Sequence, residues 1–141
     1  MLGAKTFIGD QSFAVLLGDD IFINEENPAT GQLIRAYEKN EYSITIKVVQ
    51  NATEEDVSKY EIMKPSTSSK PYGWLVKLSG MVEKSKQEDA PSNLAVMECY
   101  VLIPEIFKML ETQEPDAGEE IQLTDAIERL MNHQAAHAYD F

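Results

Sequence analysis

The chain has 141 residues, of which 43% are hydrophobic and 26% are charged, a composition typical of one soluble globular domain with a buried core. Its formal net charge of −12 would repel nucleic acids and anionic membrane surfaces, so we expect neither as a partner. Its single cysteine, Cys99, allows no intramolecular disulfide, and a reducing cytoplasm is the expected location.

The first third of the chain predicts a strand, a helix and a second strand. The apolar run at 13–17 predicts a buried strand of a largely parallel sheet. Residues 28–40 carry apolar side chains at helical spacing, and β-branched residues alternate with others over 42–49. We interpret this order as a βαβ unit whose two strands pair in parallel.

The remaining segments alternate between predicted strands and helices. Further strands are expected at 60–64, 74–84, 94–103 and 135–141. Helices are expected at 53–59, from Pro104 onward and at 119–131. Together these elements predict an α/β fold with a mixed, mostly parallel sheet and flanking helices.

Asp19 is a candidate metal ligand because it follows the first predicted strand, within Gly18-Asp19-Asp20. Ligands of open α/β sheets bind beyond the carboxyl ends of the parallel strands, and a carboxylate there can hold Mg²⁺ against phosphates. An aspartate after a strand also forms turns and caps helices. The local pattern leaves both roles open and favours the turn.

Glu83 and Lys84 end the long strand predicted at 74–84, where an acid and a base can hold a sugar hydroxyl and a phosphate. A solvated strand end explains the same pair, and spacing alone favours it. The acidic pair Glu119-Glu120 begins the helix predicted at 119–131 and suits its first turn without any further function.

The spacing of the histidines and the sequence neighbours of the cysteine predict no reactive site. His133 and His137 are spaced i, i+4, but Gln134 stands where a zinc-protease helix carries glutamate. We expect no metal there. The sequence neighbours of Cys99 supply neither a base nor a positive charge to activate a thiol, so we expect a half-buried structural cysteine.

Eight short segments occur together, in this order, in one protein family. They lie at 13–21, 55–60, 82–84, 90–95, 100–102, 104–107, 120–127 and 139–141. The chain from Phe7 onward resembles the bacterial UTP–glucose-1-phosphate uridylyltransferases. The strings Ala-Pro-Ser-Asn-Leu-Ala (90–95) and Glu-Ile-Gln-Leu-Thr-Asp-Ala-Ile (120–127) are the most specific parts of the match.

The resemblance implies a partial Rossmann-like nucleotidyltransferase fold, with residues 1–141 forming a single incomplete domain similar to the later, sugar-binding half of the family. It implies a reaction in which an oxygen of glucose 1-phosphate attacks the α-phosphate of UTP. The products are UDP-glucose and pyrophosphate. Such chemistry uses Mg²⁺ and cations to spread the developing charge.

The resemblance also assigns roles to individual residues. Asp19 is the expected metal ligand. Glu83 is expected to bind glucose hydroxyls, and Lys84, the expected catalytic residue, to bind the sugar phosphate. Asn93 and Glu120 lie in segments of the family's sugar pocket and are expected to bind substrate.

Several parts of the family pattern have no counterpart in this chain. They are the N-terminal Gly-rich loop that cradles the UTP phosphates, the uracil-recognising segments, a second metal-binding aspartate and the C-terminal helices. We therefore expect no uridylyltransferase turnover by this chain alone. The expected ligand is glucose 1-phosphate or UDP-glucose. The alternative is a non-catalytic binding protein that pairs with a full-length relative, with a missing half or with itself.

Four substitutions lie within the matched region. Glu61 and Glu98 replace family glycines, Cys99 replaces an arginine and Ser85 a proline. Glycine lets backbone approach a ligand closely, whereas glutamate adds bulk and negative charge. A like charge at ~4 Å costs about 1 kcal/mol in water and more where water is excluded. We expect weakened binding of the sugar phosphate.

Overall fold

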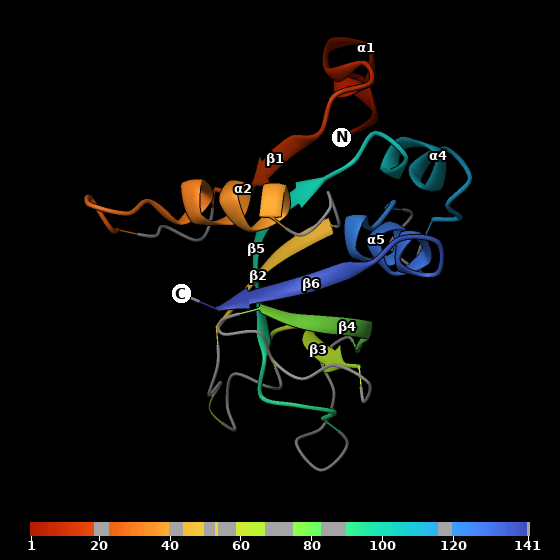
Figure 1. The fold of residues 1–141 in the computed structure, drawn as a ribbon. Helices are drawn as coiled ribbons and strands as arrows, with labels where there is room; N and C mark the ends of the chain where they lie inside the picture. Colours follow the sequence, from red (N-terminus) through yellow and green to blue (C-terminus); the bar gives the residue numbers. More distant parts are fainter. Residues whose placement is uncertain are drawn as a thin grey trace.

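The computed structural model describes residues 1–18, 23–39, 44–49, 53, 59–66, 75–82, 90–115 and 120–140. Within them, one sheet of six strands has helices on both sides, with α2 on one side and α4 and α5 on the other (Figure 1). No helix in these ranges is long and apolar enough to cross a membrane.

Most strands and helices lie close to where the sequence predicts them, whereas the two short helices at 2–8 are not predicted by it. The strands are β1 (Phe13–Leu16), β2 (Ile44–Val49), β3 (Ile62–Pro65), β4 (Leu75–Val82), β5 (Ala95–Leu102) and β6 (Ala136–Asp140). The helices are the 3-10 helix η1 (Leu2–Ala4), α1 (Lys5–Ile8), α2 (Ala29–Lys39), α4 (Ile106–Glu111) and α5 (Leu123–Met131). The helix predicted at 53–59 lies largely outside the described residues.

The order of the strands is β1-β5-β2-β6-β4-β3, and β3 also pairs with the start of β5. Among the described strands, β2 and β6 form the parallel pair, and every other pairing is antiparallel. The sheet is therefore mixed as predicted, but the expectation that it is mostly parallel is wrong for this part of the chain. Apolar runs reveal strands without revealing their direction.

The predicted parallel pairing of the first two strands is also wrong, because β5 lies between them. Both β1 and β2 pair antiparallel with β5. They therefore run in the same direction but do not hydrogen-bond to each other as neighbouring strands. Nor is β1 buried as expected. Phe13 and Val15 are half-buried, whereas Ala14 is exposed and Leu16 is 57% exposed, because β1 lies at one end of the strand order.

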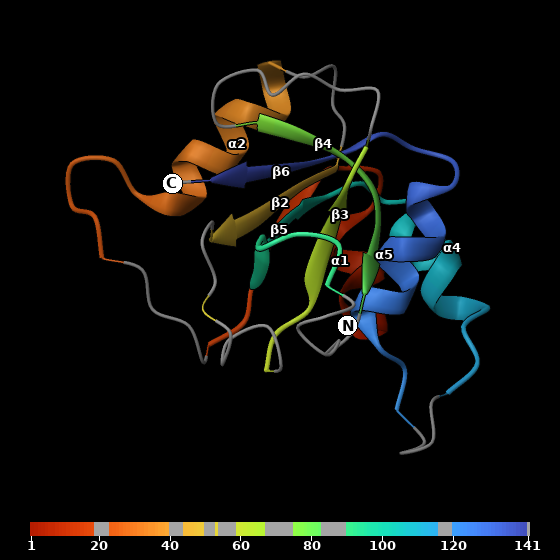
Figure 2. The same cartoon turned by 90° about the horizontal axis from the view of Figure 1, so that it is seen from below.

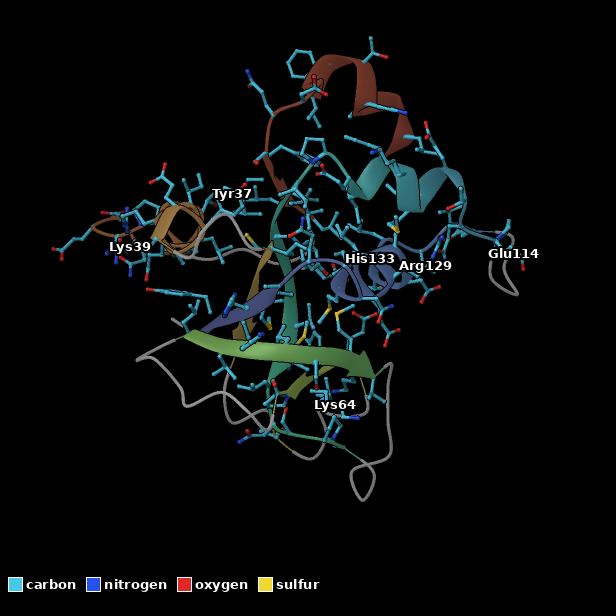
Figure 3. All side chains as sticks on the ribbon, turned by 45° about the vertical axis from the view of Figure 1, so that its right-hand side comes forward. Tyr37, Lys39, Lys64, Glu114, Arg129 and His133 are labelled. Atoms are coloured by element: carbon cyan, nitrogen blue, oxygen red, sulfur yellow. The ribbon has the colours of Figure 1, made fainter. Side chains whose placement is uncertain are left out.

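The core fills the space between the sheet and its helices. Tyr100 of β5 and Phe107 of α4 are its largest fully buried side chains. Figure 2 shows α4 and α5 side by side, on the side of the sheet opposite α2. Arg129 of α5, labelled in Figure 3, donates hydrogen bonds to the Met109 carbonyl at 2.8 Å and to Gln113 Oε1 at 2.7 Å. A cation at the Met109 carbonyl, in the last turn of α4, stabilises the end of that helix.

Helix α5 begins later than the sequence predicts. Its first residue is Leu123, and Gln122 before it has an extended backbone with φ −76° and ψ 130°. Glu120 therefore lies before the helix, not in its first turn. The residues that α5 buries, Ala126, Ile127 and Leu130, all lie after Leu123, so packing determines the start more strongly than the acidic pair does.

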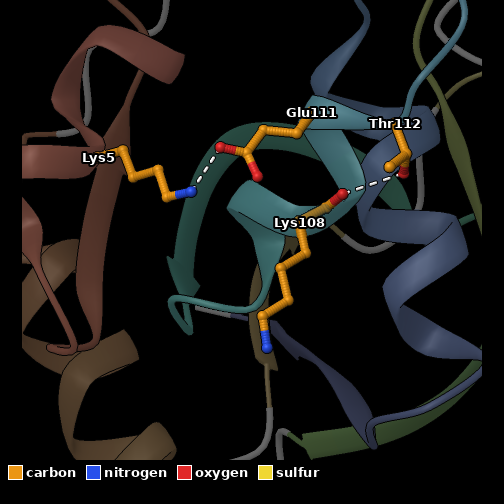
Figure 4. A network of polar contacts seen from close by, with 4 residues as sticks. All are labelled: Lys5, Lys108, Glu111 and Thr112. Carbon is orange, nitrogen blue, oxygen red and sulfur yellow. Dashed lines mark hydrogen bonds and ion pairs between the residues drawn. The ribbon is translucent and has the colours of Figure 1, made fainter.

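The N-terminal helices are tied to α4 by an ion pair on the surface. Lys5 Nζ lies 2.5 Å from Glu111 Oε1, and the side chains are 48% and 45% exposed (Figure 4). Exposed pairs of this kind contribute under ~1 kcal/mol. Next to it, Thr112 Oγ1 donates to the Lys108 carbonyl at 3.0 Å and closes the last turn of α4.

We expect the substitution Phe107→Ala to destabilise the fold by about 3–5 kcal/mol, as for large-to-small changes in cores. Phe107 is 1% exposed, and its ring stacks on that of Phe13 with centroids 5.4 Å apart. Urea denaturation followed by circular dichroism measures the change. Phe7→Ala is the matched control, because Phe7 is 93% exposed and its loss is expected to be nearly neutral. Equal effects of the two substitutions would contradict this packing.

Candidate functional site

A pocket of about 260 Å³ opens where β3, β5 and the start of α5 meet. We call it the β3–β5 pocket. Its polar lining consists of Lys59, Glu61, Glu98, Tyr100, Gln122 and Thr124. Tyr60, Leu17, Val96 and Leu123 add apolar surface, so the pocket combines flat carbon surfaces with hydrogen-bonding groups, as small-molecule sites do.

Strand alternation explains why these side chains converge. Val96, Glu98 and Tyr100 are two residues apart on β5 and therefore share the face on which α5 packs. Glu61 comes from the residue just before β3, which is held against β5 because the Val96 amide donates to the Glu61 carbonyl at 2.9 Å. The pocket is thus built on paired strands, with one wall from the segment entering α5.

A bulge in β5 shapes the floor of the pocket. Opposite β2, the register changes from Ile46↔Tyr100 to Val48↔Val96, so three residues of β5 face one residue of β2. Glu98, the middle of the three, has φ +25°, and its carbonyl accepts a hydrogen bond from the Leu17 amide at 3.2 Å. This is backbone that favours glycine. A β-bulge re-aims a side chain, here into the pocket.

Ser92 fixes the segment before β5 against β3. Its Oγ donates to the Met63 carbonyl of β3 at 2.6 Å and accepts from the Leu94 amide at 3.1 Å. The Met63 amide in turn donates to the Leu94 carbonyl at 2.9 Å. The Ala-Pro-Ser-Asn-Leu-Ala string therefore has a structural task, which is to clamp β3 against the start of β5.

The residues expected to act in the site are only partly described. Asp19, Glu83 and Lys84 lie outside the described residues. Asn93 is exposed beside the Ser92 clamp, and Glu120 is exposed two residues before Gln122. Neither is among the residues that line the pocket.

The structure brings together two of the four substitutions that the sequence singled out, because Glu61 and Glu98 both line the β3–β5 pocket. Sequence reasoning missed five polar or aromatic lining residues, each of which lies in a matched segment. They are Lys59, Tyr60, Tyr100, Gln122 and Thr124. Membership of a specific string was the signal that could have identified them.

Metal-binding groups are not assembled in the described part of the chain, where no three His, Cys, Asp or Glu side chains form a cluster. His133 lies exposed in the turn after α5, whereas His137 lies in β6, so the two rings share no helix. Cys99 is 2% exposed, more buried than expected, and it forms no disulfide.

The whole chain, residues 1–141, matches the family model of nucleotidyl transferases. The chain therefore belongs to the nucleotidyl transferase family, and the predicted α/β nucleotidyltransferase fold is confirmed.

Within that family, its similarity is to uridylyltransferases. It is 50% identical over 138 residues to the UTP–glucose-1-phosphate uridylyltransferase of Staphylococcus epidermidis, a match that covers 98% of this chain and 46% of that protein. A crystal structure of apo UDP-glucose pyrophosphorylase superposes with a TM-score of 0.88 at 36% identity, over 99% of this chain and 50% of that one. A UDP-glucose pyrophosphorylase complexed with UDP-glucose gives 0.84 at 36% identity, over 99% and 52%.

The expected resemblance is thus confirmed, and so is its partial extent. The chain spans about half the length of the relatives it matches.

We expect Glu98→Gly to be more stable than Glu98→Ala by ~0.5–1 kcal/mol, because glycine adopts φ +25° without strain whereas alanine does not. Both substitutions remove the carboxylate, so the comparison isolates the backbone. Thermal and urea unfolding of the two variants measure the difference. An alanine variant as stable as the glycine variant would show that Glu98 is not strained.

We expect the stability of the fold to decline as the pH falls below about 6.5, partly through His137. Burial, and secondarily the positive charge of Lys77 opposite it on β4, lower the pKa of His137 from its ordinary value of 6.5. Its Nδ1 is buried without a hydrogen-bond partner. The unfolded chain therefore binds more protons than the folded chain near and below pH 6.5.

The comparison of wild type with His137→Asn tests this contribution. Unfolding free energies at about pH 7.5 and about pH 5.5 bracket the unfolded pKa. Wild type is expected to lose more stability on acidification than the variant. Lys77→Gln is expected to reduce that loss without abolishing it, because burial is the larger cause. Equal losses in wild type and His137→Asn would rule the contribution out.

Proposed function

We propose that this chain binds the sugar portion of a nucleotide sugar, as the sugar-binding part of a UTP–glucose-1-phosphate uridylyltransferase, and that it does not turn over alone. The observation that carries the proposal is the β3–β5 pocket, whose lining includes residues of four segments that match that family, at 13–21, 55–60, 100–102 and 120–127. The reaction of the complete assembly is attack of glucose 1-phosphate on the α-phosphate of UTP, which releases pyrophosphate.

The lining of the pocket suits an uncharged polyol better than a phosphate. Glu61, Glu98, Gln122 and Thr124 can accept hydrogen bonds from sugar hydroxyls, and Tyr60 offers a flat surface for the carbon face of the ring. Two carboxylates with a single lysine among the described lining residues disfavour an anion. The pocket therefore suits the glucose ring that UDP-glucose and glucose 1-phosphate share, with the phosphate outside the described lining.

Five residues carry proposed roles by family resemblance. We propose that Glu83 binds glucose hydroxyls and that Lys84, the proposed catalytic residue, binds the sugar phosphate. Asn93, beside the Ser92 clamp, and Glu120, before α5, are proposed to bind substrate. Asp19 is the proposed metal ligand.

Mg²⁺ is the cofactor expected for this reaction class, since it neutralises charge on the phosphates. The described residues contain no cluster that would hold it. Asp19 alone, outside those residues, represents the site in this chain, and we assign no step to the metal.

A second function has its own support. Glu61 and Glu98 place two carboxylates in the pocket, and like charges disfavour an anionic substrate there. This arrangement favours a non-catalytic binding protein, which we propose pairs with a full-length relative. We propose a cytoplasmic location for either form.

Calorimetric titration with UDP-glucose tests the proposal. We expect weak binding by wild type and about fivefold tighter binding by Glu61→Gly and by Glu98→Gly, equivalent to about 1 kcal/mol of removed repulsion and bulk. Glu114→Gly removes an exposed acid that does not line the pocket and is the matched control.

Two results would count against the proposal. If neither wild type nor any variant binds UDP-glucose, the β3–β5 pocket is not a sugar-binding site. Formation of UDP-glucose from UTP and glucose 1-phosphate by the pure chain, above a blank, would remove the claim that it needs another part.

A further inference from the structure

The first turn of α5 forms one wall of the β3–β5 pocket, and the helix alone holds that turn weakly. Gln122, Leu123 and Thr124 line the pocket. Within the described part of the chain, the Gln122 side chain forms no capping hydrogen bond, and the bond from the Ala126 amide to the Gln122 carbonyl is long at 3.4 Å. The side chains that α5 buries begin only at Ala126. A helix start with neither a side-chain cap nor buried packing frays, so the wall needs another support.

Arg129 (Figure 3), near the end of α5, connects this helix to α4. Its Nη1 donates to Gln113 Oε1 at 2.7 Å and to the Met109 carbonyl at 2.8 Å, and its Nη2 donates to Thr112 Oγ1 at 2.8 Å. The planar guanidinium reaches acceptors on three residues at once, because its donors point in fixed, divergent directions. Arg129 therefore holds the end of α4 and the residues just after it at a fixed place on α5.

Gln113 extends this connection to the first turn of α5. Its Oε1 accepts from Arg129, and its Nε2 donates to Asp125 Oδ2 at 3.4 Å. Asp125 and Arg129 are spaced i, i+4, so they are neighbours on one face of the helix, and Gln113 bridges them. We call Arg129, Gln113 and Asp125 the α5 clasp. It joins the two ends of the segment that connects α4 to α5, at 112–122.

The position of Asp125 determines where the pocket wall lies. Consecutive residues of a helix project about 100° apart, so a contact that holds Asp125 also fixes the directions of Leu123 and Thr124 on the same turn. Gln122 enters this turn directly, as the residue before the helix. The clasp residues are not among those that line the pocket, so they act on it through the backbone of α5.

We propose that the α5 clasp positions the pocket wall at 122–124, so that Arg129, Gln113 and Asp125 tune the affinity of the β3–β5 pocket for its sugar as positioning residues. The proposal deepens the proposed function and rests on it for the identity of the ligand. The positioning has a consequence that needs no ligand, because an open clasp loosens the segment that leads into α5.

Reversal of one hydrogen bond tests the clasp. Gln113→Glu keeps an acceptor for Arg129 but places a second carboxylate beside Asp125, and a like charge at this distance shifts an equilibrium about fivefold in water. Addition of Asp125→Asn supplies an amide donor from the other side and restores the bond. Asp125→Asn alone keeps an oxygen acceptor and is expected to behave like wild type. Arg129→Gln removes the guanidinium with little change in helix propensity and opens the clasp at its other end.

Limited proteolysis with a glutamate-specific protease, without nucleotide or sugar, measures the first consequence. Glu120 is exposed between α4 and α5, and cleavage after it reports opening of that segment. We expect Gln113→Glu to accelerate this cleavage about fivefold and Arg129→Gln at least as much. The combination of Gln113→Glu with Asp125→Asn is expected to restore the wild-type rate. Cleavage after Glu25, which is exposed before α2, is the internal reference and is expected not to change.

Calorimetric titration with UDP-glucose measures the second consequence. Gln113→Glu and Arg129→Gln are expected to bind about fivefold more weakly than wild type, and the combination with Asp125→Asn to regain the wild-type affinity. A loss of global stability alone does not change the affinity at temperatures where circular dichroism shows every variant to be folded. Gln11→Glu is the matched control, because it makes the same change at an exposed position between α1 and β1. It is expected to leave both measurements unchanged.

Three results overturn the proposal. Unchanged cleavage after Glu120 in Gln113→Glu and Arg129→Gln shows that the clasp does not hold the segment. Faster cleavage with unchanged affinity shows that the clasp does not position the pocket wall. Faster cleavage that Asp125→Asn does not reverse shows that Gln113 acts through other contacts. If wild type itself does not bind UDP-glucose, the proposed function fails, and the cleavage rates alone decide whether the clasp holds the wall.

Discussion

The structure depends on β5, which hydrogen-bonds to three other strands. Its C-terminal half pairs with β1 on one side, its N-terminal end pairs with β3 on the same side, and β2 runs along the other side. A buried strand needs partners for its backbone amides and carbonyls, because an unpaired buried group costs free energy. Because nearly all of β5 is buried, a change in its course moves every element that frames the pocket.

The bulge at Glu98 is the point at which the backbone of β5 changes direction. It lies where the partner of β5 changes from β1 to β3, and it directs a carboxylate into the cavity between them. The strained backbone and part of the acidic lining of the pocket therefore belong to one residue. Glutamate keeps the pocket acidic at the cost of an unfavourable φ, and glycine would relieve both at once. Local strain of this kind is characteristic of functional sites.

The positions of the strands and helices could be predicted because periodicity and turn residues are local signals. The order of the strands could not, since nothing within β5 or β6 encodes which strands lie beside it. The start of α5 was misplaced because acids at Glu119-Glu120 suit a first turn, whereas buried packing determined it. For the site, departures from the family's glycines identified Glu61 and Glu98, but only the structure shows that Glu98 has a positive φ.

The place of β6 has a consequence for synthesis. β6 (Ala136–Asp140) is the last of the described strands in chain order, yet it lies between β2 and β4 and joins them. During translation, β2 and β4 emerge long before the strand that unites them, and each waits with one unpaired edge. Non-local pairing of this kind folds slowly and exposes edges that aggregate. The nascent chain thus has an interval of vulnerability that ends only when β6 leaves the ribosome.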